Sequence, residues 1–309
     1  MKKIMIMFSI LVLLSLTCIS ASSNGDSEWV MFGRTADHAS SYDTGEDYCE
    51  YELLWEYNSA GRIKSSPVVQ DGVVYFGGFI YSTEGQVFAV DAITGEEKWT
   101  IDWPHNSNSV DYTGVIDDGV YYVTGTVYTM ALDADDGSTI WRENVAGNDL
   151  VMSQDILYVG GSNFVAMDKH NGDIIWEYTL GGSSQSSPAV YEDKVFTGSH
   201  DGKMYALDAD DGTLLWEYQT GSQLWTPPTV VDDVVYFGSH DEVVYALDAD
   251  DGTLLWDSGL ITWHKFISSP AVYENKVFIG SHHSALGSLF VFDADDGTLL
   301  WKYKVESAI

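Results

Sequence analysis

The sequence predicts an all-β protein, a β-propeller assembled from four-stranded antiparallel blades. Two observations carry this prediction. Short apolar runs separated by Gly, Asp and Asn turns dominate the 309 residues, and one nine-residue string recurs. "DADDGTLLW" stands at 208–216, 248–256 and 293–301, and "DADDGSTIW" at 133–141. With 45% hydrophobic and 14% aromatic residues, the chain holds enough apolar material for a large core.

Seven tryptophans mark the period of the repeat. They recur about every 40 residues, and such a period with four short strands per unit is typical of a propeller. Regular spacing favours packing over ligand binding, so we assign these rings to docking one blade on the next. The set is Trp55, Trp99, Trp141, Trp176, Trp216, Trp256 and Trp301.

One unit shows how the strands connect. The links between its strands hold Asp and Gly, which form tight turns because Asp bonds nearby backbone amides and Gly accepts positive φ. A single sheet of this kind cannot bury both faces, whereas copies stacked around an axis can. The predicted strands are 186–191, 194–199, 203–209 and 214–220.

The number of blades depends on the N-terminal part. Six full units end at Trp99 and at the five later tryptophans, and "ELLWEY" at 52–57 has the pattern of a further outer strand. Either six blades close and this strand is additional, or residues 29–57 build a partial seventh blade, which we favour. The predicted domains are a signal peptide over 1–23, a lead-in with an outer strand over 24–57, and the propeller over 58–309.

The N-terminus has the pattern of a secretory signal peptide. Lys2 and Lys3 precede an apolar run over 4–16, and small residues follow at 20–23. Cleavage would leave Cys49 as the single cysteine, so an internal disulfide is not expected. We expect export to the periplasm, the cell surface or the medium, with no transmembrane span in a monomeric mature chain. The alternatives are an uncleaved anchor and a lipid anchor on Cys18.

The charge narrows the choice of partners. The chain has 47 acidic residues against 14 Lys and Arg, a formal net charge of −33. Such a surface repels nucleic acid and anionic membranes. We therefore expect no nucleic-acid partner, and a protein, peptide or glycan at the envelope or outside the cell.

Antiparallel connections sort the turns onto two faces. The face opposite to the interblade links collects the "DADDG" turns and should be densely negative. "DADDG" has acids at positions one, three and four but no distant Glu, and calcium takes six to eight oxygens, so solvated turns are the simpler interpretation. The weak calcium candidates are Asp208, Asp210, Asp248 and Asp250.

The rim face carries the interblade links and the hairpins between second and third strands. His200, His240 and His282 stand at equivalent places in three consecutive hairpins. Basic and aromatic residues before innermost strands suit an anionic or aromatic ligand or a peptide. Alternatively, the histidines are only turn residues and the tryptophans plug the channel; a three-histidine zinc site is not expected, because each His lies in a different blade. The predicted rim residues are Arg62, Lys64, His105, Gln185, Trp225, Trp263, His264 and Lys265.

"SSPAVYEDKVFTGSHDGKMYALDADDGTLLWEY" resembles the pyrroloquinoline-quinone (PQQ) repeat with its "YALDA…G…LW" core, and "WVMFGRTADHASSYDTG" at 29–45 resembles the lead-in of secreted PQQ-like proteins. The resemblance covers nearly all of 29–309. The family includes quinoprotein alcohol dehydrogenases, the propeller lipoprotein of the outer-membrane β-barrel assembly machinery, and exported propellers of unknown role. The resemblance implies PQQ and calcium as possible cofactors.

The sequence lacks the catalytic parts of the quinoprotein dehydrogenases that it resembles. Those enzymes have eight blades, and many carry adjacent cysteines over the quinone and an Asp base near calcium. This chain has no Cys-Cys pair and no esterase, zinc-protease or phosphate-loop motif. We therefore assign no catalytic residue and no cofactor, and predict a non-catalytic binding or scaffold module acting through its rim face. The alternatives are a PQQ-dependent oxidoreductase and an envelope protein-assembly scaffold.

Overall fold

Strands and turns make up the described part of the chain, which contains no helix. Two compact units divide it, with main segments Tyr42–Ala146 (unit 1) and Gly147–Ile309 (unit 2). The computed structural model describes residues 10–11, 53–59, 61–63, 65–80, 84–104, 110, 113–260, 265–283 and 286–305.

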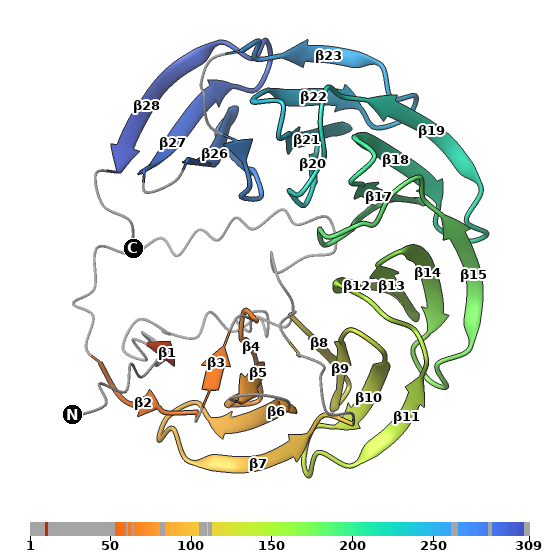
Figure 1. Ribbon diagram of the computed structural model, residues 1–309, viewed down its shortest axis with the longest axis vertical. Coiled ribbons are helices and arrows are strands. Elements are labelled where there is room, and N and C mark those ends of the chain that lie inside the picture. The colour runs from red at the N-terminus through yellow and green to blue at the C-terminus, as the bar shows by residue number, and fades with distance from the viewer. Residues whose placement is uncertain are drawn as a thin grey trace, which may run out of the picture. The chain divides into compact units, whose positions relative to one another are not determined.

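Unit 1 holds two blades and a short strand pair (Figure 1). The first blade has the order β3-β5-β6-β7, with β4 also paired to β5, and the second has the order β11-β10-β9-β8. β1 pairs antiparallel with β2 and lies in the stretch predicted as signal peptide. The bounds are β1 Ile10–Leu11, β2 Glu56–Tyr57, β3 Gly61–Ile63, β4 Val68–Gln70, β5 Val73–Ile80, β6 Glu84–Asp91, β7 Glu97–Asp102, β8 Val115–Asp117, β9 Val120–Thr124, β10 Thr129–Asp133 and β11 Thr139–Glu143.

Unit 2 holds four blades, each a run of sequential antiparallel strands (Figure 1). In the last one β24 and β25 both pair with β26. The bounds are β12 Asp149–Ser153, β13 Ile156–Gly160, β14 Asn163–Asp168, β15 Ile174–Thr179, β16 Ala189–Tyr191, β17 Lys194–Gly198, β18 Lys203–Asp208, β19 Leu214–Gln219, β20 Thr229–Val231, β21 Val234–Gly238, β22 Val244–Asp248, β23 Leu254–Asp257, β24 Lys265–Phe266, β25 Ala271–Tyr273, β26 Lys276–His283, β27 Leu286–Asp293 and β28 Leu299–Val305.

Two predicted strands are shorter than expected. The strand predicted over 186–191 begins only at Ala189, because Pro188 has no N–H to donate and the Ser187 hydroxyl donates to Asp149 of another blade. The outer strand predicted over 52–57 is confined to β2, the last two of those residues.

A β-bulge sets the directions in which the side chains of the "LLW" triplet point. In the β18–β19 pair, Leu207 faces Leu214 while the preceding Ala206 faces Trp216, so Leu215 is the extra residue. Leu214 and Leu215 are 37% and 43% exposed, whereas Trp216 is 8% exposed. The bulge therefore turns two apolar side chains outward and the indole toward the next blade.

Within unit 2, each buried tryptophan docks on the "DADDG" turn of the following blade. The Trp216 indole N–H donates to the Ala249 carbonyl at 3.1 Å. Gly252 lies so close to this ring that a Cβ would stand 2.6 Å from Trp216 Cδ2. Trp176 and Trp256 make the equivalent bonds to Ala209 and Ala294. The repeated string therefore supplies both a ring and the carbonyl and glycine that receive the preceding ring.

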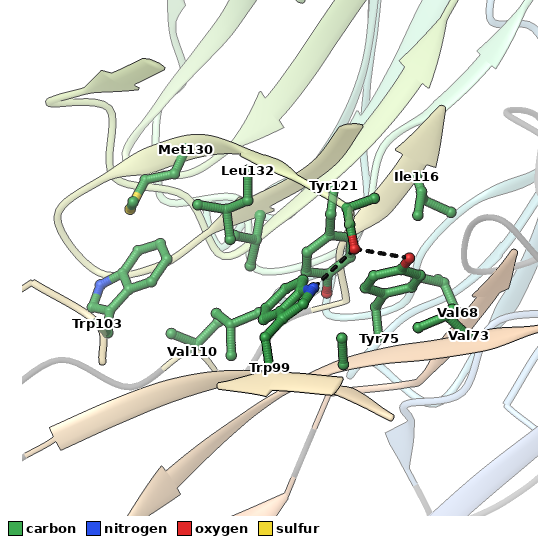
Figure 2. Close-up of a cluster of buried hydrophobic side chains, with 14 residues drawn as sticks. Val68, Val73, Tyr75, Trp99, Trp103, Val110, Ile116, Tyr121, Met130 and Leu132 are labelled. Carbon is green, nitrogen blue, oxygen red and sulfur yellow. Dashed lines mark hydrogen bonds between the residues drawn. The ribbon is translucent and has the colours of Figure 1, made fainter. Parts of the chain in front are cut away.

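The same docking occurs in unit 1. Trp99 donates to the Ala134 carbonyl at 2.8 Å and packs beside Tyr75 and Tyr121 in a buried cluster (Figure 2). Trp55 donates to the Ala92 carbonyl at 2.9 Å, so β2 takes the place of an outer strand before the first complete blade. Residues 29–52 of the predicted partial seventh blade lie outside the described residues.

Candidate functional site

Two interblade links of unit 2 are fastened by a hydroxyl that bridges to the second strand of the blade that follows. Thr226 Oγ1 donates to the Gly238 carbonyl at 2.7 Å and accepts from the Gly238 N–H at 3.1 Å. Ser268 makes the same pair of bonds with Gly280. The residue before each hydroxyl is thereby held at the surface, and Trp225 and Ile267 are 38% and 46% exposed there.

Two predicted histidines contact Trp225. The ring centroids of His200 and Trp225 lie 4.3 Å apart, and those of His240 and Trp225 lie 5.3 Å apart with the planes within 6°. The hairpins reach the links through backbone bonds: the His240 N–H donates to the Gln223 carbonyl, and Gln223 Oε1 accepts the indole N–H of Trp225 at 3.1 Å. We call the cluster of His200, Trp225 and His240 the aromatic ledge.

The ledge is electrically neutral at neutral pH. Burial, the positive charge of Lys265 and the neighbouring His200 lower the pKa of His240 to about 4, although Asp241 acts in the opposite direction. Burial also lowers the pKa of His200. Nε2 of each imidazole is buried and has no hydrogen-bond partner.

The carboxylates beside the two histidines hold the hairpins of the ledge in place through hydrogen bonds. Asp241 accepts hydrogen bonds from the Gly221 N–H at 2.7 Å and from the Tyr245 hydroxyl at 2.8 Å. Asp201 accepts from the Tyr205 hydroxyl and from the backbone N–H of Lys203. Each hairpin is therefore tied down by its aspartate, and the adjacent histidine is left to contact the indole.

The structure brings Trp225, one of the predicted rim residues, together with two of the three hairpin histidines. A second predicted rim residue, Lys265, is near enough for its positive charge to lower the pKa of His240. Gln185 is exposed at the place equivalent to Trp225 one blade earlier, and His282 is exposed opposite Lys265 in the β24–β26 pair. Arg62 is exposed on β3 of unit 1. The predicted residues outside the described part are Lys64, His105, Trp263 and His264.

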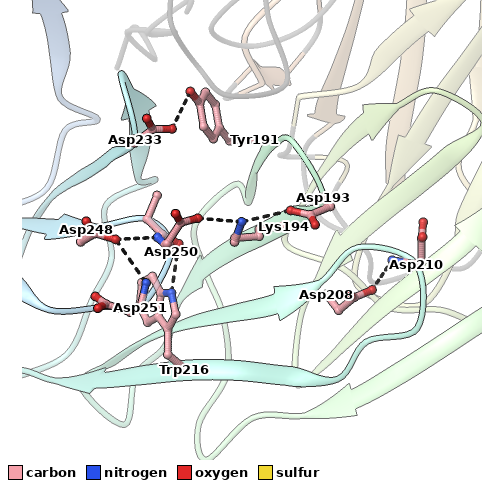
Figure 3. Close-up of polar contacts among 11 residues, drawn as sticks. Tyr191, Asp193, Lys194, Asp208, Asp210, Trp216, Asp233, Asp248, Asp250 and Asp251 are labelled. Atoms are coloured by element: carbon pink, nitrogen blue, oxygen red, sulfur yellow. Dashed lines mark hydrogen bonds and ion pairs between the residues drawn. The ribbon is translucent and has the colours of Figure 1, made fainter.

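The acidic turns follow the third strand of each blade, β18 and β22 among them, and so lie at the strand ends opposite to the histidine hairpins. Figure 3 shows two of these turns. The carboxylates of Asp208 and Asp248 accept hydrogen bonds from backbone N–H groups of their own turns, including those of Asp210 and Asp250. The Lys194 ammonium lies 3.0 Å from a carboxylate oxygen of Asp193 and 3.0 Å from one of Asp250. Among the residues that the structure describes, no three His, Cys, Asp or Glu side chains are placed to share a metal ion.

Sequence reasoning missed Asp149, the first residue of the innermost strand β12. The Ser187 hydroxyl and the Leu150 N–H donate to its carboxylate. Burial nevertheless raises the pKa of Asp149 to about 7, which those hydrogen bonds offset only in part. The register places Asp149 where the next blade has Ser187, and this break in the repeat was the available signal.

Asp149→Asn should stabilise the protein at alkaline pH. The folded-state pKa lies above the unfolded value near 3.9, so the folded state retains a proton that the unfolded state releases, and stability falls as pH rises from about 4 toward 7. The asparagine keeps an acceptor for Ser187 without the charge. Urea denaturation at pH 5 and pH 8 should show the larger gain at pH 8; an equal effect at both would contradict the shifted pKa.

A PQQ-like repeat family model, described as outer membrane protein assembly factor BamB, matches residues 29–126, 123–224 and 165–308. The chain belongs to this family. The resemblance identified in the sequence is thereby confirmed.

The names of the relatives describe two different functions. One stretch is 34% identical over 104 residues to a quinohemoprotein alcohol dehydrogenase of Comamonas testosteroni, covering 30% of this chain and 14% of that one. Another is 29% identical over 147 residues to BamB of Yersinia pestis, covering 41% and 37%. The matches span well under two thirds of either relative.

Solved structures agree on the fold. BamB of Moraxella catarrhalis aligns with a TM-score of 0.70 at 18% identity, over 84% of this chain and 82% of that one. The Comamonas testosteroni dehydrogenase aligns with a TM-score of 0.73 at 15% identity, over 91% and 67%. The predicted β-propeller of four-stranded antiparallel blades is confirmed. In the described residues, no helix is long and apolar enough to span a membrane.

Proposed function

We propose that the chain is an exported, non-catalytic propeller that binds another polypeptide through the rim face of unit 2. The aromatic ledge is the observation that carries the proposal. It holds an exposed indole against two imidazoles that are neutral at neutral pH. Exposed Ile267 stands at the equivalent place of the next blade, so an apolar contact can extend over two blades.

The chemistry of the ledge suits a protein segment. Tryptophan anchors that become buried on binding and are surrounded by polar groups dominate many protein interfaces, and Gln223 supplies such a group beside Trp225. With a net charge of −33, the chain would associate fastest with a neutral or basic partner. The occupant we propose is an extended segment that presents an apolar or aromatic side chain to Trp225.

Two other functions have support from relatives. The dehydrogenase names suggest a PQQ oxidoreductase, but the carboxylates nearest the ledge are engaged by tyrosines and backbone amides, and the sequence has no adjacent cysteines. These residues do not fit a calcium-bound quinone. The BamB name suggests an envelope assembly scaffold, for which a lipid on Cys18 found by mass spectrometry would be the direct sign.

Trp225→Ala should remove partner binding. Peptides displayed on phage and selected against the wild-type protein at neutral pH should lose at least about tenfold in affinity for the variant, because the central indole of the contact is gone. Leu215→Ala is the matched control, since Leu215 is exposed to a similar extent, 43%, on an outer strand.

Peptides that bind the Trp225 variant as well as wild type would refute docking at the ledge, as would a selection that yields no binder. Titration with PQQ and calcium separates the enzymatic alternative. Calcium-dependent binding of the quinone would replace the proposed function with a quinoprotein one.

A further inference from the structure

Neither imidazole of the ledge has a hydrogen-bond acceptor beside its Nε2 atom, where protonation would require one. Nε2 of His200 and Nε2 of His240 are buried without a partner. A protonated imidazole donates from both ring nitrogens, so each ring would then bury an unsatisfied donor as well as a charge.

The charges around His240 come from three elements. Its own hairpin contributes Asp241, strand β24 contributes Lys265, and the preceding hairpin contributes His200. Asp241 would favour a proton on His240, but both its oxygens already accept hydrogen bonds, from Gly221, Tyr245 and Val243. Lys265 and a protonated His200 both repel the added charge.

The groups around His200 are similarly engaged. Asp201 accepts a hydrogen bond from the Tyr205 hydroxyl, and Lys203 Nζ lies 2.5 Å from Glu217 Oε1 in an ion pair. Glu242, on the hairpin of His240, adopts φ 74°, where the equivalent residue of the previous blade is Gly202 at φ 85°. The hairpin of His240 therefore holds a left-handed backbone conformation that is strained for a non-glycine residue.

We propose that the aromatic ledge is a local acid-sensitive switch: protonation of His240 and His200 moves their rings away from Trp225 and removes the docking surface while the blades stay folded. The proposal rests on the proposed function for its biological meaning, and on the ledge alone for its physics. The sign follows from the pKa values, since both lie below the ordinary histidine value of 6.5. With the rings packed against Trp225, the histidines bind protons less tightly than free imidazoles do. Acidification below pH 6.5 therefore favours the state in which the rings have moved away from Trp225.

Nuclear magnetic resonance of the purified protein tests this without a partner. With ¹³C-labelled histidine and ¹⁵N-labelled tryptophan, we expect His240 to titrate with a midpoint near 4. The Trp225 indole resonance, assigned by Trp225→Phe, should shift with that midpoint while the other indoles stay in place. His240→Phe retains an aromatic ring against Trp225 and should abolish the part of the shift that follows the His240 midpoint. His282→Phe, at an exposed position within strand β26, should not.

Three outcomes would overturn the switch. They are a His240 midpoint near 6.5, a Trp225 indole that stays in place while His240 protonates, and a simultaneous shift of every indole, which means global unfolding. The failure of the switch is separable from the failure of docking. Peptide binding at neutral pH tests only docking, whereas the titration tests only the ledge.

Discussion

Trp216→Ala should lower the free energy of unfolding of unit 2 by about 4 kcal/mol. The indole is 8% exposed, packs against Phe196 with centroids 5.7 Å apart, and donates to the Ala249 carbonyl at 3.1 Å. Truncation leaves a cavity between two blades and a buried carbonyl without its donor. Guanidinium denaturation followed by far-ultraviolet circular dichroism measures the loss.

Trp301→Ala is the matched control, because the same nine-residue string surrounds both tryptophans. Trp301 is 46% exposed and contacts Phe278 edge-on at 6.3 Å. Its removal should cost no more than about 1 kcal/mol. Equal losses in the two variants would show that the rings stabilise their own sheets, and would refute docking as the function of the string.

The fold was predictable from the sequence because its cause is repetition. The recurring string sets the period, and the four strands and the Asp-Gly turns of each unit followed from the residues between its copies. The exposed Leu214 and Leu215 did not follow, because a strand that alternates strictly would bury one of them. The bulge before Trp216 is visible only in the register.

The candidate site was predictable in part. Topology placed His200, His240, Trp225 and Lys265 on one face, and the structure brings these four together. Which ring contacts which depends on the path of each link, and that path is set by hydrogen bonds such as Thr226 to Gly238, which no periodicity reveals. Asp149 was missed for a related reason: its environment, rather than its residue type, raises its pKa.

Gly252→Ala should destabilise unit 2 by about 3 kcal/mol, for two separable reasons. Gly252 adopts φ +73°, which costs an alanine about 1 kcal/mol, and its new Cβ would stand 2.6 Å from Trp216 Cδ2. Gly259→Ala in the same unit isolates the first cost, because Gly259 adopts φ +62° with nothing within 4 Å of a Cβ. Guanidinium denaturation should therefore show about 1 kcal/mol for the control.

A double-mutant cycle joins this prediction to the first. In a Trp216→Ala background the ring that the new Cβ meets is gone, so Gly252→Ala should cost only the backbone strain, about 1 kcal/mol. Coupling of about 2 kcal/mol between the two sites would mean that the glycine of each "DADDG" turn is required by the tryptophan of the preceding blade. Strict additivity would mean instead that the turn needs glycine for its own conformation, and that the string recurs without reference to its neighbour.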